Sequence, residues 1–188
     1  SQAVEFTMGE IETIGGNAFY NCSLVEYFNS ETQYKIEIPS TVISVGEYAF
    51  NGLTLIKEVY VPEKLETIGN GAFKGCNSIE KITLPFVGAK DGVEDYTSVF
   101  GYIFGYSRSS LSGWIDGSIV SSAKFINEKT GTAPSGTIWQ FSNVGSYDSY
   151  DHKIYSYYYY IPKTIKEVVI TVDTTIPVAA FKECSFIE

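Results

Sequence analysis

The chain has 188 residues, of which 44% are hydrophobic, and a formal net charge of −9 with a single arginine, Arg108. This charge excludes the clustered Lys and Arg side chains that neutralise nucleic acid phosphates, and it disfavours anionic membrane surfaces. No run approaches the ~20 apolar residues that cross a bilayer, so we expect no membrane insertion by this segment. The start lacks a signal peptide, which predicts either a cytosolic chain or a chain whose signal was removed.

The first predicted element covers residues 4–24. Val4 and Phe6 alternate as a short strand would, and the phrase Ile-Gly-x-x-Ala-Phe-x-x-Cys follows from Ile14 to Cys22. The phrase recurs later in the chain, which makes this stretch an imperfect first copy of a repeat.

Residues 25–33 separate this copy from the next. The interval from Phe19 to Phe50 is longer than the interval from Phe50 to Phe73, and the difference is eight extra residues in this stretch. Its polar composition predicts a solvent loop that bulges from the repeat.

The regular copies run to residue 86, and a period of about 23 residues is typical of a solenoid, in which each coil buries its apolar side against its neighbours. Branched residues alternate before each proline, as at Val59, and predict a strand with one buried face. Gly46 and Gly69 are expected at a turn with positive φ. The segment from Ala to Cys is expected to form a short helical turn on the other side of the coil. Four strand residues should share one buried column: Ile36, Val59, Ile82 and Val168.

The three cysteines lie on the same grid, because Cys22, Cys76 and Cys184 each follow the phenylalanine of an Ala-Phe pair by three residues. Leu53 takes this place in the remaining copy, so the column is expected to be apolar and buried. Cys22 and Cys76 are two coils, or about 10 Å, apart at the usual strand spacing, whereas a disulfide requires Cα atoms within about 7 Å. We therefore predict three free thiols, with a disulfide as the minor alternative.

Residues 87–160 interrupt the repeat. They include both tryptophans and ten of the fifteen tyrosines, with weak helix periodicity, and we interpret them as an insertion of short strands and loops packed on the solenoid. Its aromatic side chains either form the core of this insertion or contact a ligand, since Trp and Tyr dominate binding hot spots. The candidate ligand-binding residues are Trp114, Trp139, Tyr155, Tyr157 and Tyr159.

Residues 161–188 resume the repeat, and the domain organisation predicted from the sequence is therefore repeat coils over 1–86, the insertion over 87–160 and further coils over 161–188. Pro177 replaces the usual glycine of the turn. The chain stops where another strand is expected, which suggests a piece of a longer repeat protein or an end that contacts another copy.

Residues that could support catalysis or metal binding are few. His152 is the only histidine and lies in a polar stretch, and no Gly-x-Ser-x-Gly elbow or paired Cys-x-x-Cys motif is present. Residues 91–95 are interpreted as a solvated acidic turn, with calcium as a minor alternative. We expect no enzyme activity, no metal and no cofactor.

The phrase Ile-Gly-x-x-Ala-Phe-x-x-Cys, followed by x-x-Ile-x-x-Ile-x-Leu-Pro, resembles the BspA-like leucine-rich repeat over residues 4–86 and 161–188. The resemblance implies a right-handed solenoid with a parallel β-sheet on one face and short helical turns or loops on the other. It also implies secretion or cell-surface display, and no catalytic residues.

Three functions stay open at this point. The first is an extracellular binding module of a bacterial surface protein that adheres to a host or bacterial protein. The second is a carbohydrate-binding surface protein that uses the Trp- and Tyr-rich insertion. The third is a structural spacer.

Overall fold

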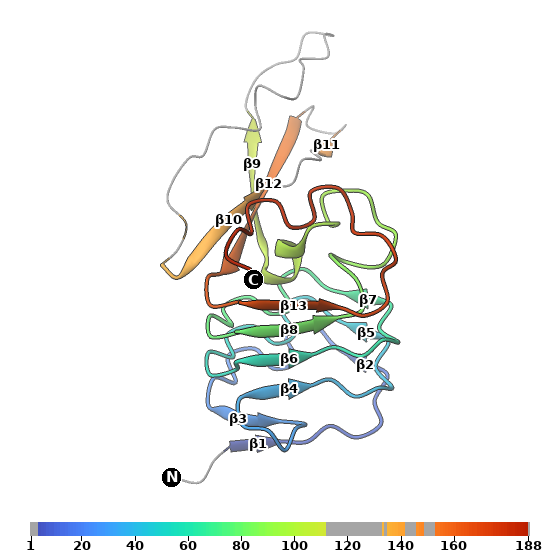
Figure 1. The fold of residues 1–188 in the computed structure, drawn as a ribbon, viewed down its shortest axis with the longest axis vertical. Coiled ribbons are helices and arrows are strands. Elements are labelled where there is room, and N and C mark those ends of the chain that lie inside the picture. The colour runs from blue at the N-terminus through green and yellow to red at the C-terminus, as the bar shows by residue number, and fades with distance from the viewer. Residues whose placement is uncertain (1–3, 112–132, 134, 142–145, 149–152, 188) are drawn as a thin grey trace.

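The computed structural model describes residues 4–111, 133, 135–141, 146–148 and 153–187. Its sheet with the most strands, called the large sheet below, is parallel and has six strands stacked along the long axis of the molecule (Figure 1). Every adjacent pair in this sheet is parallel. In spatial order the strands are β1 (Val4–Phe6), β3 (Val25–Phe28), β4 (Lys35–Glu37), β6 (Glu58–Tyr60), β8 (Lys81–Leu84) and β13 (Glu167–Ile170).

The strand register of the large sheet is the one predicted from the repeat. Ile36 pairs with Val59, Val59 with Ile82, and Ile82 with Val168. The first three side chains are fully buried, whereas Val168 is only half-buried because it lies on the edge strand. The regular period thus places identical positions of successive repeats beside one another, which confirms the predicted column.

A second, smaller parallel sheet lies on the opposite side of the repeats, where we expected only turns or loops. Its three strands have two residues each: β2 (Thr13–Ile14), β5 (Ser44–Val45) and β7 (Thr67–Ile68). The isoleucine or valine of each strand is buried, and the preceding residue is half-buried or exposed. Two residues are too short a run for the alternation that predicts a strand from sequence.

Hydrogen-bonded turns, rather than helices, follow these short strands. The amide of Ala49 donates to the carbonyl of Gly46 at 3.4 Å, and the amide of Asn51 donates to the carbonyl of Tyr48 at 3.1 Å. Stacking between repeats is carried by the backbone: Phe19 N donates to Ala49 O at 2.7 Å, and Phe50 N donates to Ala72 O at 2.8 Å. The phenylalanine rings also stack, with ring centroids 5.4 Å apart for Phe19 and Phe50.

The predicted solvent loop at residues 25–33 is wrong for its first part. Residues 25–28 form β3, which pairs with β1 on one side and β4 on the other, and Phe28 is fully buried. Phe28 lies nine residues after Phe19, as Val59 lies nine residues after Phe50, so the strand signal was present in the repeat. The eight extra residues let one repeat supply two strands, because the chain turns back through residues 29–34 and begins β4.

Gly46 and Gly69 also differ from expectation, since neither has a positive φ. They are required for close approach: a Cβ atom on Gly46 would lie 2.4 Å from the backbone nitrogen of Gly16, and one on Gly69 would lie 2.3 Å from that of Glu47. The left-handed conformation falls two residues later, at Gly71, where φ is 63°. Glycine therefore lets neighbouring repeats pack backbone against backbone.

The cysteines are free, as predicted. Cys76 and Cys184 are buried, and the Cys76 thiol donates to the carbonyl oxygen of Phe50 at 3.1 Å. Burial raises the pKa of the Cys76 thiol to about 12, so it stays protonated at neutral pH. Cys22 is half-buried, because it belongs to the first repeat, which has a neighbour on one side only.

The interruption of the repeat begins with residues that still extend the stack. The 3-10 helix η1 (Phe100–Phe104) is the only helix in the described residues, and it accepts the amides of the last regular repeat. Phe73 N donates to Ile103 O at 2.8 Å, and Gly71 N donates to Tyr102 O at 3.0 Å. An antiparallel sheet follows and projects beyond β13 (Figure 1). Its strands are β9 (Tyr106–Leu111), β10 (Thr137–Phe141), β11 (Ser146–Asp148) and β12 (Lys153–Pro162).

Gln140 joins this antiparallel sheet to the stack. Its side chain is fully buried, and its Oε1 accepts the amide of Gly101 at 2.6 Å. Its Nε2 donates to the carbonyl oxygen of Ala180 at 2.8 Å, and the same carbonyl accepts the amide of Phe100 at 2.9 Å. One amide side chain thus connects β10, η1 and the C-terminal turn.

Candidate functional site

The outward face of the large sheet carries charged side chains that pair with one another. Register places Lys35, Glu58, Lys81 and Glu167 in one row across four strands. Lys81 contacts Glu167 at 2.9 Å, and Lys35 contacts Glu58 at 3.8 Å. Each charge faces an opposite charge, so this row has little net charge to offer a partner.

A second charged row lies just before these strands. Lys166 contacts Glu80 at 2.9 Å, and the hydrogen bond and charge of Lys166 lower the pKa of the Glu80 carboxyl. Both side chains of this pair are exposed, and ion pairs in water contribute little to stability. The two rows therefore determine where charges lie on this face, and they contribute little to the free energy of unfolding.

A row of residues that contains Tyr60 lies beside the paired charges. Register aligns Glu37 with Tyr60, and Tyr60 with Thr83. Tyr60 is at the centre of the sheet and its side chain is 38% exposed. Sequence reasoning missed it, although its place between the buried Val59 and Val61 marks it as outward-facing.

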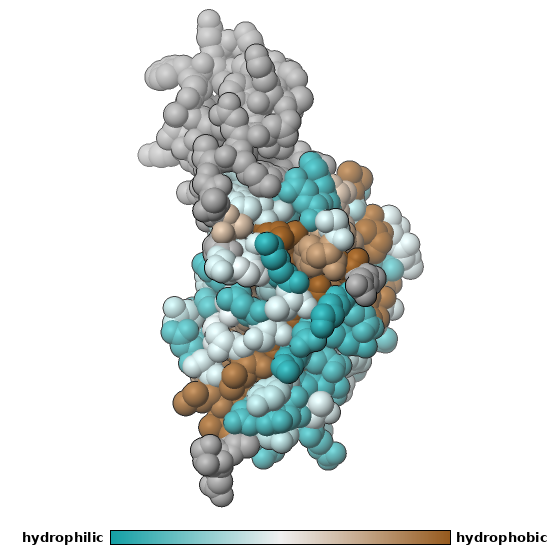
Figure 2. All heavy atoms as spheres, turned by 60° about the vertical axis from the view of Figure 1, so that its left-hand side comes forward, coloured by the Kyte–Doolittle hydropathy of each residue, from teal (hydrophilic) through white to brown (hydrophobic). Residues whose placement is uncertain are grey.

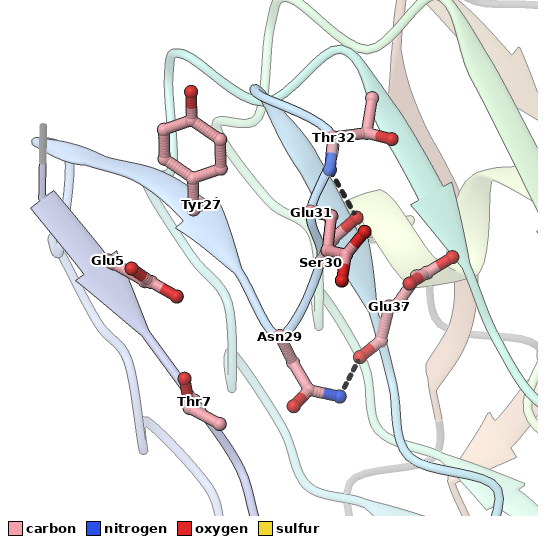
Figure 3. Close-up of a pocket in the computed structure, with 8 residues that line it drawn as sticks. All are labelled: Glu5, Thr7, Tyr27, Asn29, Ser30, Glu31, Thr32 and Glu37. Carbon is pink, nitrogen blue, oxygen red and sulfur yellow. Dashed lines mark hydrogen bonds between the residues drawn. The ribbon is translucent and has the colours of Figure 1, made fainter.

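A hollow of about 680 Å³ opens at the N-terminal end of the same sheet, between β1, β3 and the loop that leads into β4 (Figure 3). Asn29 shapes it: the side-chain amide donates to Glu37 O at 2.9 Å, and its Oδ1 accepts the amide of Met8 at 3.1 Å. The lining contains three carboxylates and no Lys, Arg or His. The lining residues are Glu5, Thr7, Tyr27, Asn29, Ser30, Glu31, Thr32 and Glu37.

The sequence analysis gave no signal for this hollow, since it assigned the region to a solvent loop. The hollow exists because the eight extra residues form a strand followed by a tight return, which leaves the loop at residues 29–34 standing above the sheet (Figure 3). One of its carboxylates is engaged, as Glu37 Oε1 accepts a hydrogen bond from Lys35 Nζ at 2.7 Å.

The predicted ligand-binding residues fall into three groups. Trp114 lies outside the described residues. Tyr155 lies on β12, where it pairs with Ser110 of β9 and Ser146 of β11, and its side chain is outside the described part. The remaining three residues, Trp139, Tyr157 and Tyr159, lie on the two faces of the antiparallel sheet.

Tyr157 and Tyr159 are 5% and 0% exposed. The ring of Tyr157 stacks on that of Tyr96 with centroids 3.9 Å apart, and the Tyr159 hydroxyl donates to the backbone carbonyl of Tyr96. Burial raises the pKa of Tyr159, and it raises that of the neighbouring Tyr102 to about 12. These two tyrosines belong to a buried cluster within the insertion, together with Val99 and Tyr96. Of the predicted ligand-binding residues, Trp139, Trp114 and Tyr155 stay candidates.

Trp139 lies on the opposite face of this sheet, since side chains alternate along a strand. Its ring contacts Tyr160 and Tyr158, with centroids 5.1 and 5.3 Å away, and Trp139 and Tyr160 are half-buried. The structure thus separates the predicted aromatic residues into an inner group and an outer group.

Residues with metal-binding or acid–base potential are not clustered. In the part of the chain that the structure describes, no three His, Cys, Asp or Glu side chains are placed to hold a metal ion. Residues 91 and 92 form a turn, and Asp91, Glu94 and Asp95 are exposed, as expected for a solvated acidic turn. His152 lies outside the described residues.

Asp173, which contacts the start of the insertion, is an acidic residue with a raised pKa. Its Oδ2 accepts the amide of Val87 at 2.9 Å, while its buried Oδ1 has no hydrogen-bond partner among the described residues. Burial, together with the nearby Asp91 carboxyl, raises the pKa of Asp173. The side chain ties the start of the interruption to the segment after β13.

Residues 12–97 match six copies of the family described as BspA type leucine rich repeat region, and this part of the chain consists of repeats of that family. No curated protein and no solved structure matches the chain. Leucine-rich repeats generally act as non-catalytic scaffolds that bind proteins, and BspA-type repeats are typical of cell-surface or secreted bacterial proteins. Among the described residues, no helix has the length and apolar character to cross a membrane.

Proposed function

We propose that this chain is a non-catalytic extracellular binding module of a bacterial surface protein, and that it mediates adhesion by contacting a protein partner. The observation that carries the proposal is the outward face of the six-stranded sheet, where equivalent positions of successive repeats stand side by side on β4, β6 and β8. A face built this way is broad and rigid, and each repeat widens it by one strand.

Tyr60 is the expected anchor of this contact. It is the exposed aromatic side chain at the centre of the sheet, and the charged row beside it is already internally paired. Aromatic side chains at the centre of an interface carry much of the binding energy, because surrounding contacts exclude water from them.

A panel of extracellular-matrix proteins and bacterial surface proteins, measured by surface plasmon resonance, tests the proposal. For a protein that binds, Tyr60→Ala is expected to weaken the Kd about tenfold or more. Tyr20→Ala is the matched control, since Tyr20 is an exposed tyrosine in a turn of the first repeat, outside the sheet. Equal losses in the two variants would contradict a contact centred on β6.

Carbohydrate binding is the second candidate, supported by the outer aromatic group of the insertion. Trp139 and Tyr160 are half-buried neighbours, and rings of this kind offer flat apolar surfaces next to polar tips. A glycan array with the unmodified chain and with Trp139→Ala tests it. Binding that survives Trp139→Ala would move the search to Trp114 and Tyr155. Failure of both the glycan array and the protein panel would favour a structural spacer.

A further inference from the structure

Charge is distributed unevenly over the outward face of the large sheet. Hydrophilic residues cover much of the visible surface of the stack, with smaller hydrophobic areas between them (Figure 2). On β8 and β13 the charges are balanced, since Lys81 contacts Glu167 at 2.9 Å. Residues 4–37, which run from β1 to β4, contain six glutamates and a single basic residue, Lys35. Lys35 is already engaged by carboxylates on β4 and β6, at 2.7 and 3.8 Å, so negative charge is in excess on this part of the face.

The hollow described above collects part of that charge. Its lining includes Glu5 and Glu31, which are exposed and whose carboxylates make no ion pair with the described residues. The same lining holds the side chain of Tyr27 and the hydroxyl groups of three Ser and Thr residues (Figure 3). An ammonium or guanidinium group in the hollow would find carboxylate acceptors, and charge-assisted hydrogen bonds are the strong ones.

The hollow belongs to the face of the stack and not to its end. Its wall is the loop at residues 29–32, between β3 and β4, and each of these strands has a neighbouring strand on both sides. Tyr27 on its floor points outward, because the next residue, Phe28, is buried. The opening therefore faces away from the sheet, whereas stacking adds strands within the plane of the sheet. A further strand beside β1 would extend the floor and leave the opening free.

Tyr60 lies on the same face and close to the hollow. Register places it beside Glu37, which is one of the lining residues. β6 is two strands away from β3 and three from β1, which corresponds to about 10–14 Å at the usual strand spacing. The Tyr60 side chain is 38% exposed, so one partner can contact this ring and reach into the hollow.

We propose that a protein partner docks on this face with an aromatic side chain against Tyr60 and a Lys or Arg side chain in the hollow. The inference deepens the proposed protein-binding function and rests on it. Its basis is charge complementarity beside an exposed aromatic ring. The aromatic contact supplies affinity, whereas the charge fixes the orientation of the partner, because the balanced charges of β8 and β13 do not attract a basic side chain.

The test uses two peptides, acetyl-Trp-Gly-Gly-Gly-Arg-amide and the same peptide with Gln in place of Arg, in NMR titrations of the isotope-labelled chain. Their terminal residues lie about 13 Å apart when the peptide is extended, which matches the distance from Tyr60 to the hollow. We expect saturable shifts at the amides of residues 29–32 and of Tyr60 with the Arg peptide, and a Kd about fivefold weaker or more with the Gln peptide. Binding of the Arg peptide should weaken as salt rises from about 50 to about 300 mM.

Glu31→Lys tests the hollow itself, since Glu31 is exposed on the loop and its side chain supports no contact of the core. We expect this variant to weaken the Kd of the Arg peptide about tenfold or more, with an unchanged Tm and little effect on the Gln peptide. Glu63→Lys is the matched control, because Glu63 is an exposed glutamate between β6 and β7, outside the large sheet. It should change the Kd less than about twofold.

Four outcomes overturn the inference. Equal effects of Glu31→Lys and Glu63→Lys would reduce the binding to the general attraction of a chain with net charge −9. Equal binding of the two peptides would remove the basic side chain from the partner. Peptide binding that is lost in Glu31→Lys but unchanged in Tyr60→Ala would contradict a joint contact. No saturable binding of the Arg peptide, with a panel protein still weakened by Tyr60→Ala, would leave the proposed function standing and remove the hollow from it.

Discussion

The regular repeats and the insertion solve the same problem, burial of apolar surface, in different ways. Between residues 35 and 86 each buried position is matched by its copy in the next repeat, and neighbouring repeats touch through backbone and rings. In the insertion, burial depends on individual partners, such as Tyr157 on Tyr96 and Gln140 on Gly101. The repeats therefore distribute stability over equivalent contacts, whereas the insertion concentrates it in a few.

A charge placed in the buried column of the repeats is expected to cause the largest loss of stability. Ile82 is fully buried between Val59 and Val168, so Ile82→Asp leaves an unpaired charge in the core. We expect a loss of more than about 4 kcal/mol in the free energy of unfolding, or no folded protein. Lys81→Gln, at the neighbouring outward position, should cost less than about 1 kcal/mol. Urea titration followed by circular dichroism measures both, and similar costs would contradict the register.

Removing the Gln140 side chain probes the concentrated contacts of the insertion. Gln140→Ala leaves the buried Gly101 amide without its acceptor, while the Ala180 carbonyl keeps only the Phe100 amide, and we expect a cost of about 1–3 kcal/mol. Gln33→Ala is the control, since Gln33 is exposed. Hydrogen exchange should show faster exchange at Phe100 and in β10 than in β6. Uniform acceleration over all repeats would argue that the two regions are not separable.

Glycine replacement sharpens the comparison within the stack. Gly69→Ala puts a Cβ atom 2.3 Å from the backbone of Glu47, and we expect a loss of about 1–3 kcal/mol because backbone has to move. Gly15→Ala, at the same place in the first repeat, meets nothing and should change stability by less than about 0.5 kcal/mol. Thermal unfolding of the two variants measures the difference. A similar Tm for both would contradict the role assigned to this glycine column.

The smallest effect concerns the outer charges. Lys166 lowers the folded-state pKa of Glu80, so ionised Glu80 stabilises the fold above its unfolded pKa of about 4.5, and this contribution is lost as pH falls through the lower folded pKa. Lys166→Gln should raise the pKa of Glu80 and flatten this part of the stability profile. NMR titration of the Glu80 carboxyl carbon measures the pKa directly. An unchanged pKa in the variant would assign the shift to Lys57 instead.

Much of the fold was predictable because equivalent positions of successive repeats pair with one another across neighbouring strands. The regular spacing of Pro39, Pro62 and Pro85 predicted the strands, the buried column and the free cysteines. The second sheet was missed because strands of two residues have no measurable alternation. β3 was missed because the polar residues 29–33 outweighed the spacing of Phe28 from Phe19.

The candidate sites were less predictable, because exposure is decided by what packs on each side chain. Aromatic composition alone placed Tyr157, Tyr159 and Trp139 in one group, and only the pairing of β12 with its neighbours separated two buried rings from an outer one. The hollow beside Glu5 and Glu31 joins two segments that are distant in the chain, and it depends on the return of the chain after β3.

By itself, the sequence of this protein determined a stack of equivalent repeats, since a fixed period forces like residues to meet like residues across parallel strands. Tertiary structure alone decided where the stack is open. Gly15 and Gly69 occupy the same place in the repeat, yet one faces empty space and the other presses on Glu47. That difference comes from the neighbouring repeat and not from the glycine itself, so it cannot be predicted from the residue type at one position.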